Sequence, residues 1–233
     1  MFRQQENILM NLFGKRLDAP ELPDTPVGLQ CRELMEAKTR GELGGEIARL
    51  VLFHSPSDIQ QMKRNFETKV RDLDPAYRER VTSKITEHLL GTYLRIRLDN
   101  QQGVYRIWDQ PIADNKKKYW QMVAGQCNEA NGADAPAIRF LKYLLAGYAM
   151  LVLDEPGHLV GTPFPGGNEV EFTEGIYYCP VRDKAGDVDA ALCPFCPAQH
   201  TPKIGYLRPA TKPTERNKQE FIDNCYRNHN FNG

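Results

Sequence analysis

Three cysteines lie within a short stretch near the C-terminal end of the chain, and thiols at such spacing bind metal ions. Cys193 and Cys196 flank a Cys-Pro-Phe-Cys turn, and Cys179-Pro180 follows a segment with the composition of a strand. Two thiolates separated by two residues can hold one ion, and a third thiolate with one further ligand completes a tetrahedral shell. The pattern therefore predicts a metal site in this stretch.

The fourth ligand has three candidates. His200 follows Cys196 by four residues, a spacing at which a neutral imidazole reaches the same ion. Cys225 would complete a four-thiolate site if the terminal segment folds back, and His158 would be delivered by a loop rich in glycine and proline. We place His200 first. The predicted metal ligands are then Cys179, Cys193, Cys196 and His200.

Several kinds of site fit these cysteines. A structural zinc suits the Cys-Pro-x-Cys turn and is our first interpretation. An iron–sulfur cluster would use Cys225 as its fourth thiolate. A glutaredoxin-like dithiol also carries Cys-Pro-aromatic-Cys, but that fold places the motif near its start, and too little chain follows Cys193 here. The remaining alternative is that the cysteines bind nothing.

The loop from His158 to Gly167 also has two interpretations. It could present the backbone N–H groups of Gly166 and Gly167 to an anion, with His158 as an acid or base beside an open zinc position. That arrangement would make the protein a zinc-dependent hydrolase. The simpler interpretation is that Pro-Gly-Gly turns the chain and that His158 packs or forms a hydrogen bond. We favour the simpler one.

Composition excludes several functional classes. The 233 residues carry 30 basic and 30 acidic side chains, so no net field draws the chain to nucleic acid, and Lys116–Lys118 fits a solvated face. The longest apolar run, Ala137–Leu153, contains two charges and is too short to span a bilayer. Met1–Phe13 lacks the unbroken apolar run of a secretory signal. We expect a cytoplasmic protein without a membrane partner, and clustered cysteines in a reducing compartment favour metal chemistry.

The elements that must position the site are mostly helical. Apolar residues recur at spacings of three and four in a series of segments, which predicts amphipathic helices. Ser55-Pro56 and Asp74-Pro75 each combine a capping side chain with proline at the first helical position. The predicted helices are Leu29–Lys38, Leu43–Phe53, a helix from Pro56, a helix from Pro75 to about Leu98, and one that follows Lys116–Lys118. Gly41, Gly44 and Gly45 are expected to weaken the join between the first two of these helices.

The composition changes at Asp154. The segment 137–153 is apolar on nearly all sides and is predicted to be the central buried helix. After it come a loop, two short strands joined at Glu174-Gly175, and the cysteines. We therefore expect a mainly α protein, with a helical body over 1–153 and a β-hairpin and metal-binding segment over 154–233 packed on it as one unit.

Several of these blocks resemble an uncharacterised protein family of methanogenic archaea that carries an unknown-function label. The specific ones are the stretch from His158 through Gly161-Thr162-Pro163-Phe164-Pro165-Gly166-Gly167, the run Tyr177-Tyr178-Cys179-Pro180-Val181, and Ala191-Leu192-Cys193 with Phe195-Cys196. The resemblance implies an archaeal cytoplasm and brings no activity with it. The sequence thus predicts a binding or scaffold module with a structural zinc. The alternatives are the zinc hydrolase and the iron–sulfur protein. Whether the protein is an enzyme, and what its partners are, does not follow from the residues.

Overall fold

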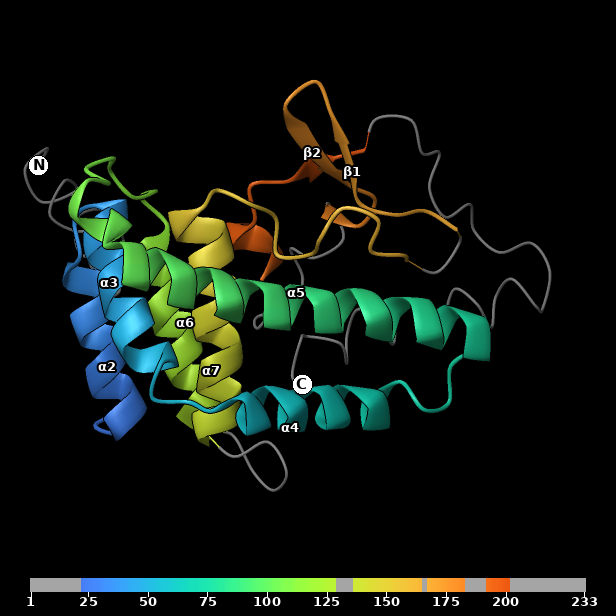
Figure 1. The fold of residues 1–233 in the computed structure, drawn as a ribbon, viewed down its shortest axis with the longest axis horizontal. Helices are drawn as coiled ribbons and strands as arrows, with labels where there is room; N and C mark the ends of the chain where they lie inside the picture. The colour runs from blue at the N-terminus through green and yellow to red at the C-terminus, as the bar shows by residue number, and fades with distance from the viewer. Residues whose placement is uncertain (1–21, 129–135, 165–166, 183–191, 202–233) are drawn as a thin grey trace, which may run out of the picture.

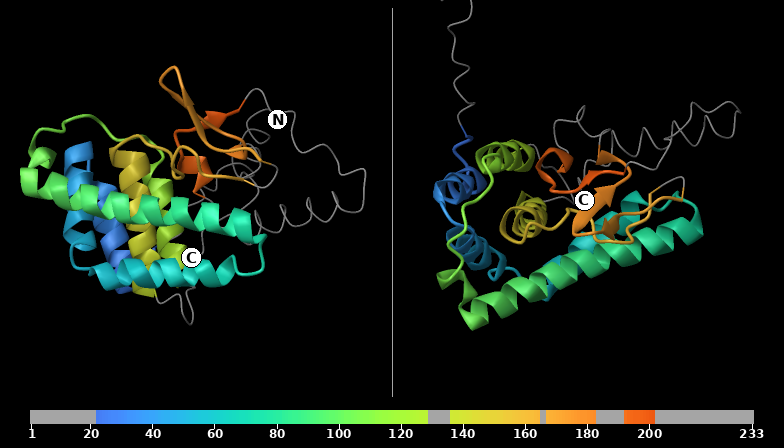
Figure 2. Two further views of the ribbon diagram at one scale, coloured as in Figure 1. Left: turned by 45° about the vertical axis from the view of Figure 1, so that its right-hand side comes forward. Right: turned by 90° about the horizontal axis from the view of Figure 1, so that it is seen from above.

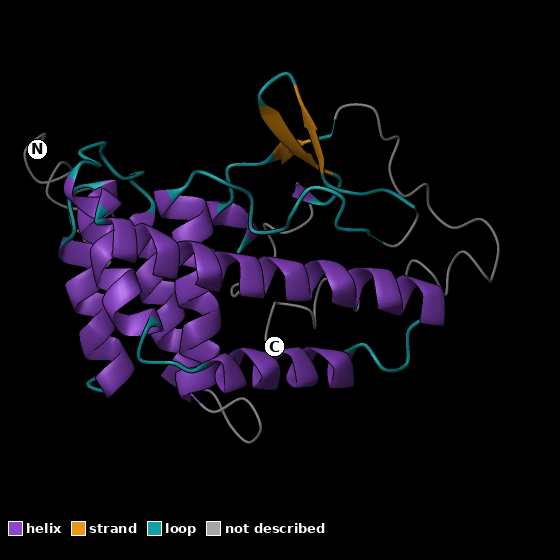
Figure 3. Ribbon diagram, viewed as in Figure 1, coloured by secondary structure: helices purple, strands orange, loops and turns teal. Residues whose placement is uncertain are grey.

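The computed structural model describes residues 22–128, 136–164, 167–182 and 192–201. Within these ranges the chain is mainly α, with six α-helices and one small three-stranded sheet. The helices and the sheet are separated in Figure 3, where the strands stand apart from the helical mass. The N-terminal stretch Met1–Phe13 and the candidate ligand Cys225 lie outside the described residues. No described helix combines the length and the apolarity that a membrane crossing requires.

The helical body is a bundle crossed by a helical hairpin. Its bundle helices are α2 (Pro26–Glu36), α3 (Arg40–Val51), α6 (Lys116–Asn128) and α7 (Pro136–Gly147). The hairpin consists of α4 (Pro56–Lys69) and the long α5 (Pro75–Gln102), which run across the bundle in Figure 1. Figure 2 confirms the crossing, because its right-hand view shows bundle helices nearly end-on while α5 runs lengthwise along one side.

The helix starts follow the capping signals in the sequence. The Ser55 N–H and the Asp58 carboxylate close a capping box at the start of α4, and Pro56 occupies the first turn. At the start of α5 the Asp74 side chain accepts a hydrogen bond from the Tyr77 N–H at 3.0 Å. Helix α5 ends at Gln102 and is capped by Gly103, whose φ of 67° is left-handed. The helix therefore extends about one turn beyond the predicted end at Leu98.

Helix α3 begins at Arg40, before the predicted Leu43, so the glycines expected at a weak join lie inside the helix. The helix includes Gly41 and Gly44, because the chain after α5 packs directly on them through the short 3₁₀ turn η1 (Val104–Arg106). A Cβ on Gly41 would lie 2.1 Å from the carbonyl oxygen of Tyr105. Gly41 is therefore a contact point between two backbones, and Gly44 faces the ring of Tyr105. Tertiary packing outweighs the low helix propensity of both glycines.

The most apolar segment lies at the centre of the core. Every residue from Arg139 to Gly147 is buried, and the helix continues into a π-helical turn, η2 (Tyr148–Val152), whose residues are buried too. Tyr119 and Trp120 of α6 pack beside it, and a Cβ on Gly147 would lie 3.0 Å from each ring. A helix surrounded on all sides by other elements needs apolar residues around its whole circumference, which explains its composition.

The sheet contains the predicted hairpin and one strand that we did not predict. Strand β1 (Glu171–Thr173) pairs antiparallel with β2 (Ile176–Cys179), and the turn residues Glu174 and Gly175 both have positive φ, as a two-residue hairpin turn requires. Strand β3 (Gln199–His200) pairs parallel with β2. The hairpin projects from the body, so Phe172 is exposed rather than inward-facing and rests on Tyr177 across the ladder.

Candidate functional site

The sheet brings two of the four predicted ligands side by side. Cys179 ends β2 and is buried, and its Cα partner on the parallel strand β3 is His200. Directly paired residues on neighbouring strands carry their side chains on the same face of a sheet. The unpredicted strand therefore places an imidazole beside the Cys179 thiol, although twenty residues separate them in the sequence.

The other two predicted ligands lie on a 3₁₀ turn. Residues Cys193–Phe195 form η4, with Pro194 in its first turn, and the Cys196 N–H donates to the Cys193 carbonyl oxygen at 3.1 Å. Phe195 meets Tyr119 of α6 edge-to-face, with ring centroids 5.1 Å apart. The turn is thereby anchored to the helical body, and both cysteines are half-buried.

The three thiols share one neighbourhood. Burial raises the pKa of Cys179 to about 12, and the nearby Cys193 and Cys196 add to this effect. Burial also raises the pKa of Cys193 to about 11, again with a contribution from Cys196. Negative charges gathered in a poorly solvated region repel each other, so Cys179 and Cys193 stay protonated at neutral pH unless a cation joins them.

Groups that favour a thiolate surround the same cluster. The Gly157 N–H donates to the Cys196 sulfur at 3.4 Å, and a backbone hydrogen bond from Val181 to the Cys179 sulfur acts to lower the pKa of that thiol. Arg182 lies close enough to lower the pKa of both Cys179 and Cys193. Backbone N–H donors and a neighbouring cation are what second-sphere stabilisation of metal-bound thiolate requires.

The described side chains do not form a coordination shell. In the ranges that the structure describes, no group of three or more His, Cys, Asp or Glu side chains has an arrangement that could hold a metal ion. The four predicted ligands are thus neighbours whose sulfur and nitrogen atoms do not yet converge on one point. The metal site remains a prediction.

His158 lies beside the cysteines without joining them. It follows Gly157, which bonds Cys196, and its ring rests edge-to-face on Phe164 with centroids 5.4 Å apart. Burial and the charge of His88 lower the pKa of His158 to about 3, so its imidazole is neutral. Gly167 donates its N–H to the Phe164 carbonyl oxygen at 3.2 Å, which closes the turn and leaves that N–H unavailable to an anion. These contacts agree with the simpler interpretation of the loop.

A buried histidine escaped the sequence analysis. His88 of α5 is buried, and within the described part of the chain neither ring nitrogen has a hydrogen-bond partner. It lines a cavity of about 30 Å³, together with Lys142 of α7, Gly157 and Leu192. Burial lowers the pKa of His88 to about 4. Helical spacing could have revealed this burial, because His88 follows Ile85 by three residues and so lies on the inward face of α5.

A second polar group inside the core was also missed. The Tyr148 hydroxyl donates to Asp99 Oδ2 at 2.5 Å, and Arg95 Nε bonds both carboxylate oxygens of Asp99 at 2.8 and 2.9 Å. The hydroxyls of Tyr105 and Tyr148 lie 3.2 Å apart. The apolar segment 137–153 predicted a core position for Tyr148, which is right for its buried ring but leaves out the hydrogen bond of its hydroxyl. Asp99 is a buried carboxylate whose charge these partners satisfy.

The other two cysteines of the described residues lie in the helical core. Cys31 of α2 and Cys127 of α6 are buried where these helices pack, and burial raises the pKa of both thiols, that of Cys127 to about 12. Both belong to the main core cluster, as expected for cysteines on inward helical faces.

The fold and the site define a class: a mainly helical protein with a small sheet and a cluster of thiols at the base of that sheet. The chain belongs to the family described as "Uncharacterized protein conserved in archaea (DUF2115)", which matches residues 39–201. This finding confirms the resemblance seen in the His158, Cys179 and Cys193 blocks, all of which fall inside the matched range.

The curated relatives come from methanogens. A UPF0305 protein of Methanothermobacter thermautotrophicus is 32% identical over 140 residues, which is 60% of this chain and 82% of the relative. UPF0305 protein MJ0646 of Methanocaldococcus jannaschii is 25% identical over 168 residues, covering 72% of this chain and 94% of the relative. A 69-residue match to a UPF0305 protein of M. thermautotrophicus reaches 49% identity.

In the shorter matches the chain spans about half the length of the curated relatives, 43% and 50% in two of them. No solved structure matches the chain.

Proposed function

We propose that this protein is a cytoplasmic binding or scaffold module whose C-terminal segment is held together by a structural zinc ion. The predicted ligands are Cys179, Cys193, Cys196 and His200. The observation that supports the proposal is the strand register, which sets His200 beside Cys179 while η4 delivers the other two thiols to the same neighbourhood. A cytoplasmic setting agrees with the five described cysteines, all of which are free thiols.

The environment suits zinc chemically. A Zn²⁺ ion would replace the protons that the buried thiols otherwise keep, and the Gly157 and Val181 N–H groups would then bond thiolate sulfur. The proposed site would close only when its ion binds. Such coupling between metal binding and folding is usual for small cysteine-rich segments.

The hydrolase alternative is weaker. It needs an open coordination position and a base whose pKa lies near the working pH. His158 is the one histidine that the loop brings beside the cluster, but its pKa of about 3 makes it a poor proton acceptor at neutral pH. An iron–sulfur cluster remains an alternative outcome of the same experiment, because it would draw on the same thiols.

The test is the metal content of protein purified without oxygen, compared between the wild type and Cys193→Ser. We expect one equivalent of zinc and no visible absorption in the wild type. The variant should lose the ion, and the segment after Asp154 should become sensitive to protease while the helical body stays folded.

The matched control is Cys31→Ser, which removes a thiol outside the cluster and should keep the full equivalent of metal. A Cys193→Ser protein that keeps its zinc would remove Cys193 from the ligand set. A brown protein containing iron would replace zinc with a cluster, and a wild type without metal would overturn the proposal.

A further inference from the structure

Helix α5 carries an exposed apolar stripe in addition to the one that faces the core. Leu90, Leu94 and Leu98 are spaced by four residues, lie on one face, and are 37%, 50% and 47% exposed. Gly91 lies on the same face, and a Cβ built there would meet nothing within 4 Å. The exposed face of α5 is therefore a row of leucines beside a notch.

This stripe is separate from the core-facing side of α5. A different set of apolar residues packs the inward face of α5 into the core, and all of them are buried: Val81, Ile85, Leu89, Tyr93 and Ile96. A helix on the surface of a monomer usually carries polar residues opposite its core stripe. A second ordered row of leucines marks a contact surface.

An exposed aromatic side chain lies in the turn after α3, which contacts α5. The Tyr93 hydroxyl donates to the carbonyl oxygen of His54 at 3.1 Å, so the turn after α3 is held against the middle of α5. The residue before His54 is Phe53, the most exposed large apolar side chain of the described chain at 86%. Aromatic residues are enriched where surfaces become buried between proteins.

Two charged residues lie beside the leucines, and their positions indicate what kind of partner the stripe could bind. Glu87 precedes Gly91 by four residues, and Arg97 follows Leu94 by three. When two copies of α5 lie antiparallel and cross between Gly91 and Leu94, each Leu94 enters the notch over the other copy's Gly91. The same register brings Glu87 of each copy opposite Arg97 of the other, to within about one helical rise of 1.5 Å. A parallel arrangement would instead oppose like charges.

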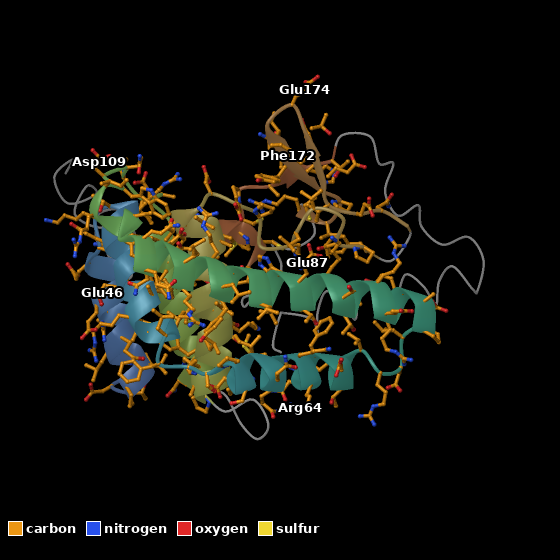
Figure 4. The ribbon with its side chains drawn as sticks, in the orientation of Figure 1. Glu46, Arg64, Glu87, Asp109, Phe172 and Glu174 are labelled. Carbon is orange, nitrogen blue, oxygen red and sulfur yellow. The ribbon has the colours of Figure 1, made fainter. Side chains whose placement is uncertain are left out.

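We propose that this surface is the interface of a two-fold symmetric dimer, with a second copy of the chain as its occupant. The surface is self-complementary, because it carries the knob and the notch together with both signs of charge, as an isologous contact requires. Arg97 has no ion pair among the described residues, and Glu87 pairs with Lys84 within its own helix at 3.0 Å. Figure 4 labels Glu87 on α5. The inference is independent of the proposed zinc.

The first test is the mass of the full chain in solution, measured by sedimentation over a range of concentrations. We expect twice the chain mass of 26.6 kDa. Leu94→Glu should give the single-chain mass, because a charge would be buried at the centre of the interface. Leu29→Glu is the matched control, since Leu29 of α2 is equally exposed at 51% and lies off the stripe; it should remain a dimer.

The second test fixes the orientation. Glu87→Arg and Arg97→Glu, made singly, should each weaken the dimer about tenfold, because two symmetric pairs become repulsive. The double variant restores opposite charges across the interface and should recover the wild-type dissociation constant. A wild type that stays monomeric at all concentrations overturns the proposal, as does a Leu94→Glu protein that remains dimeric. A double variant no better than either single overturns the antiparallel register.

Discussion

His88 keeps a neutral imidazole inside the core, and this makes the protein sensitive to acid. Its pKa in the folded chain is about 4, against about 6.5 for an exposed histidine, so the unfolded chain binds a proton first as the pH falls. The contribution of the neutral imidazole to the free energy of unfolding is fully present above pH 6.5 and is lost as the pH falls toward 4. The charged or titratable groups near it are Glu87, Lys142 and His158, and the pKa of His158 is lowered in the same direction.

Replacing His88 with leucine should therefore flatten the acid side of the stability profile. The wild type should lose about 1.4 kcal/mol per pH unit through this residue between pH 6.5 and 4, and His88→Leu should lack that contribution. At pH 7 the variant should be at least as stable as the wild type, because both ring nitrogens lack partners in the described structure. Urea unfolding at pH 7 and pH 5 measures both effects. Equal losses in the two proteins would show that His88 does not stay neutral.

At the scale of the element, α3 depends on a glycine that the sequence presents as a weakness. A Cβ on Gly41 would meet two carbonyl oxygens of the chain after α5, those of Tyr105 at 2.1 Å and Trp108 at 2.6 Å. Both are backbone atoms, which move only if the whole turn moves. Gly41→Ala should thus destabilise the protein by about 1–3 kcal/mol, as overpacking does.

Gly125 supplies the matched control for this substitution. It lies within α6, and a Cβ there would meet nothing within 4 Å. Gly125→Ala should stabilise the protein by about 0.5–1 kcal/mol through helix propensity alone. Thermal unfolding of the two variants should move in opposite directions. A harmless Gly41→Ala would mean that η1 does not pack as closely as the structure has it.

The elements differ in how far local sequence specifies them. Ser55-Pro56 and Asp74-Pro75 contain their own capping chemistry, so the starts of α4 and α5 could be predicted from a few residues. Strand β3 could not, because a two-residue strand has no periodicity and exists only through its pairing with β2. The inclusion of Gly41 in α3 likewise depends on η1, which lies some sixty residues further along the chain.

The candidate site shows the same division. Cysteine spacing predicted which side chains could be metal ligands. In the structure Cys179 pairs with His200 and has Cys193 and Cys196 as neighbours, and the metal site itself stays a prediction. The buried His88 and the Tyr148–Asp99 pair were missed, because a single polar residue on an apolar stripe does not reveal its partners. Whether the four side chains hold an ion is a property of their final geometry, which spacing does not specify.

At the scale of the whole molecule, the C-terminal segment and the helical body share a core. Leu192 belongs to the main core cluster, and Phe195 packs against it through Tyr119. Phe195→Ala should lower the free energy of unfolding by about 1–2 kcal/mol, because it removes a partly buried ring and an aromatic pair. It should also speed protease cleavage after Asp154.

The control is Phe172→Ala on β1, whose ring is exposed on the projecting hairpin and whose loss should change stability by less than about 0.5 kcal/mol. Urea denaturation and limited proteolysis of the two variants give the comparison. If Phe195→Ala is as mild as Phe172→Ala, the segment does not depend on its contact with the body.

The parallel pairing of Cys179 with His200 has a consequence in polymer terms. The twenty residues between them form a closed loop, and closing it costs about 3 kcal/mol of chain entropy. A two-residue strand contributes few hydrogen bonds, each worth about 1 kcal/mol net. A tie between the loop ends would therefore add to the closure that Leu192 and Phe195 already favour by packing on the helical body. Under the proposed zinc, the concentration of free metal would shift the fraction of molecules in which this ring exists.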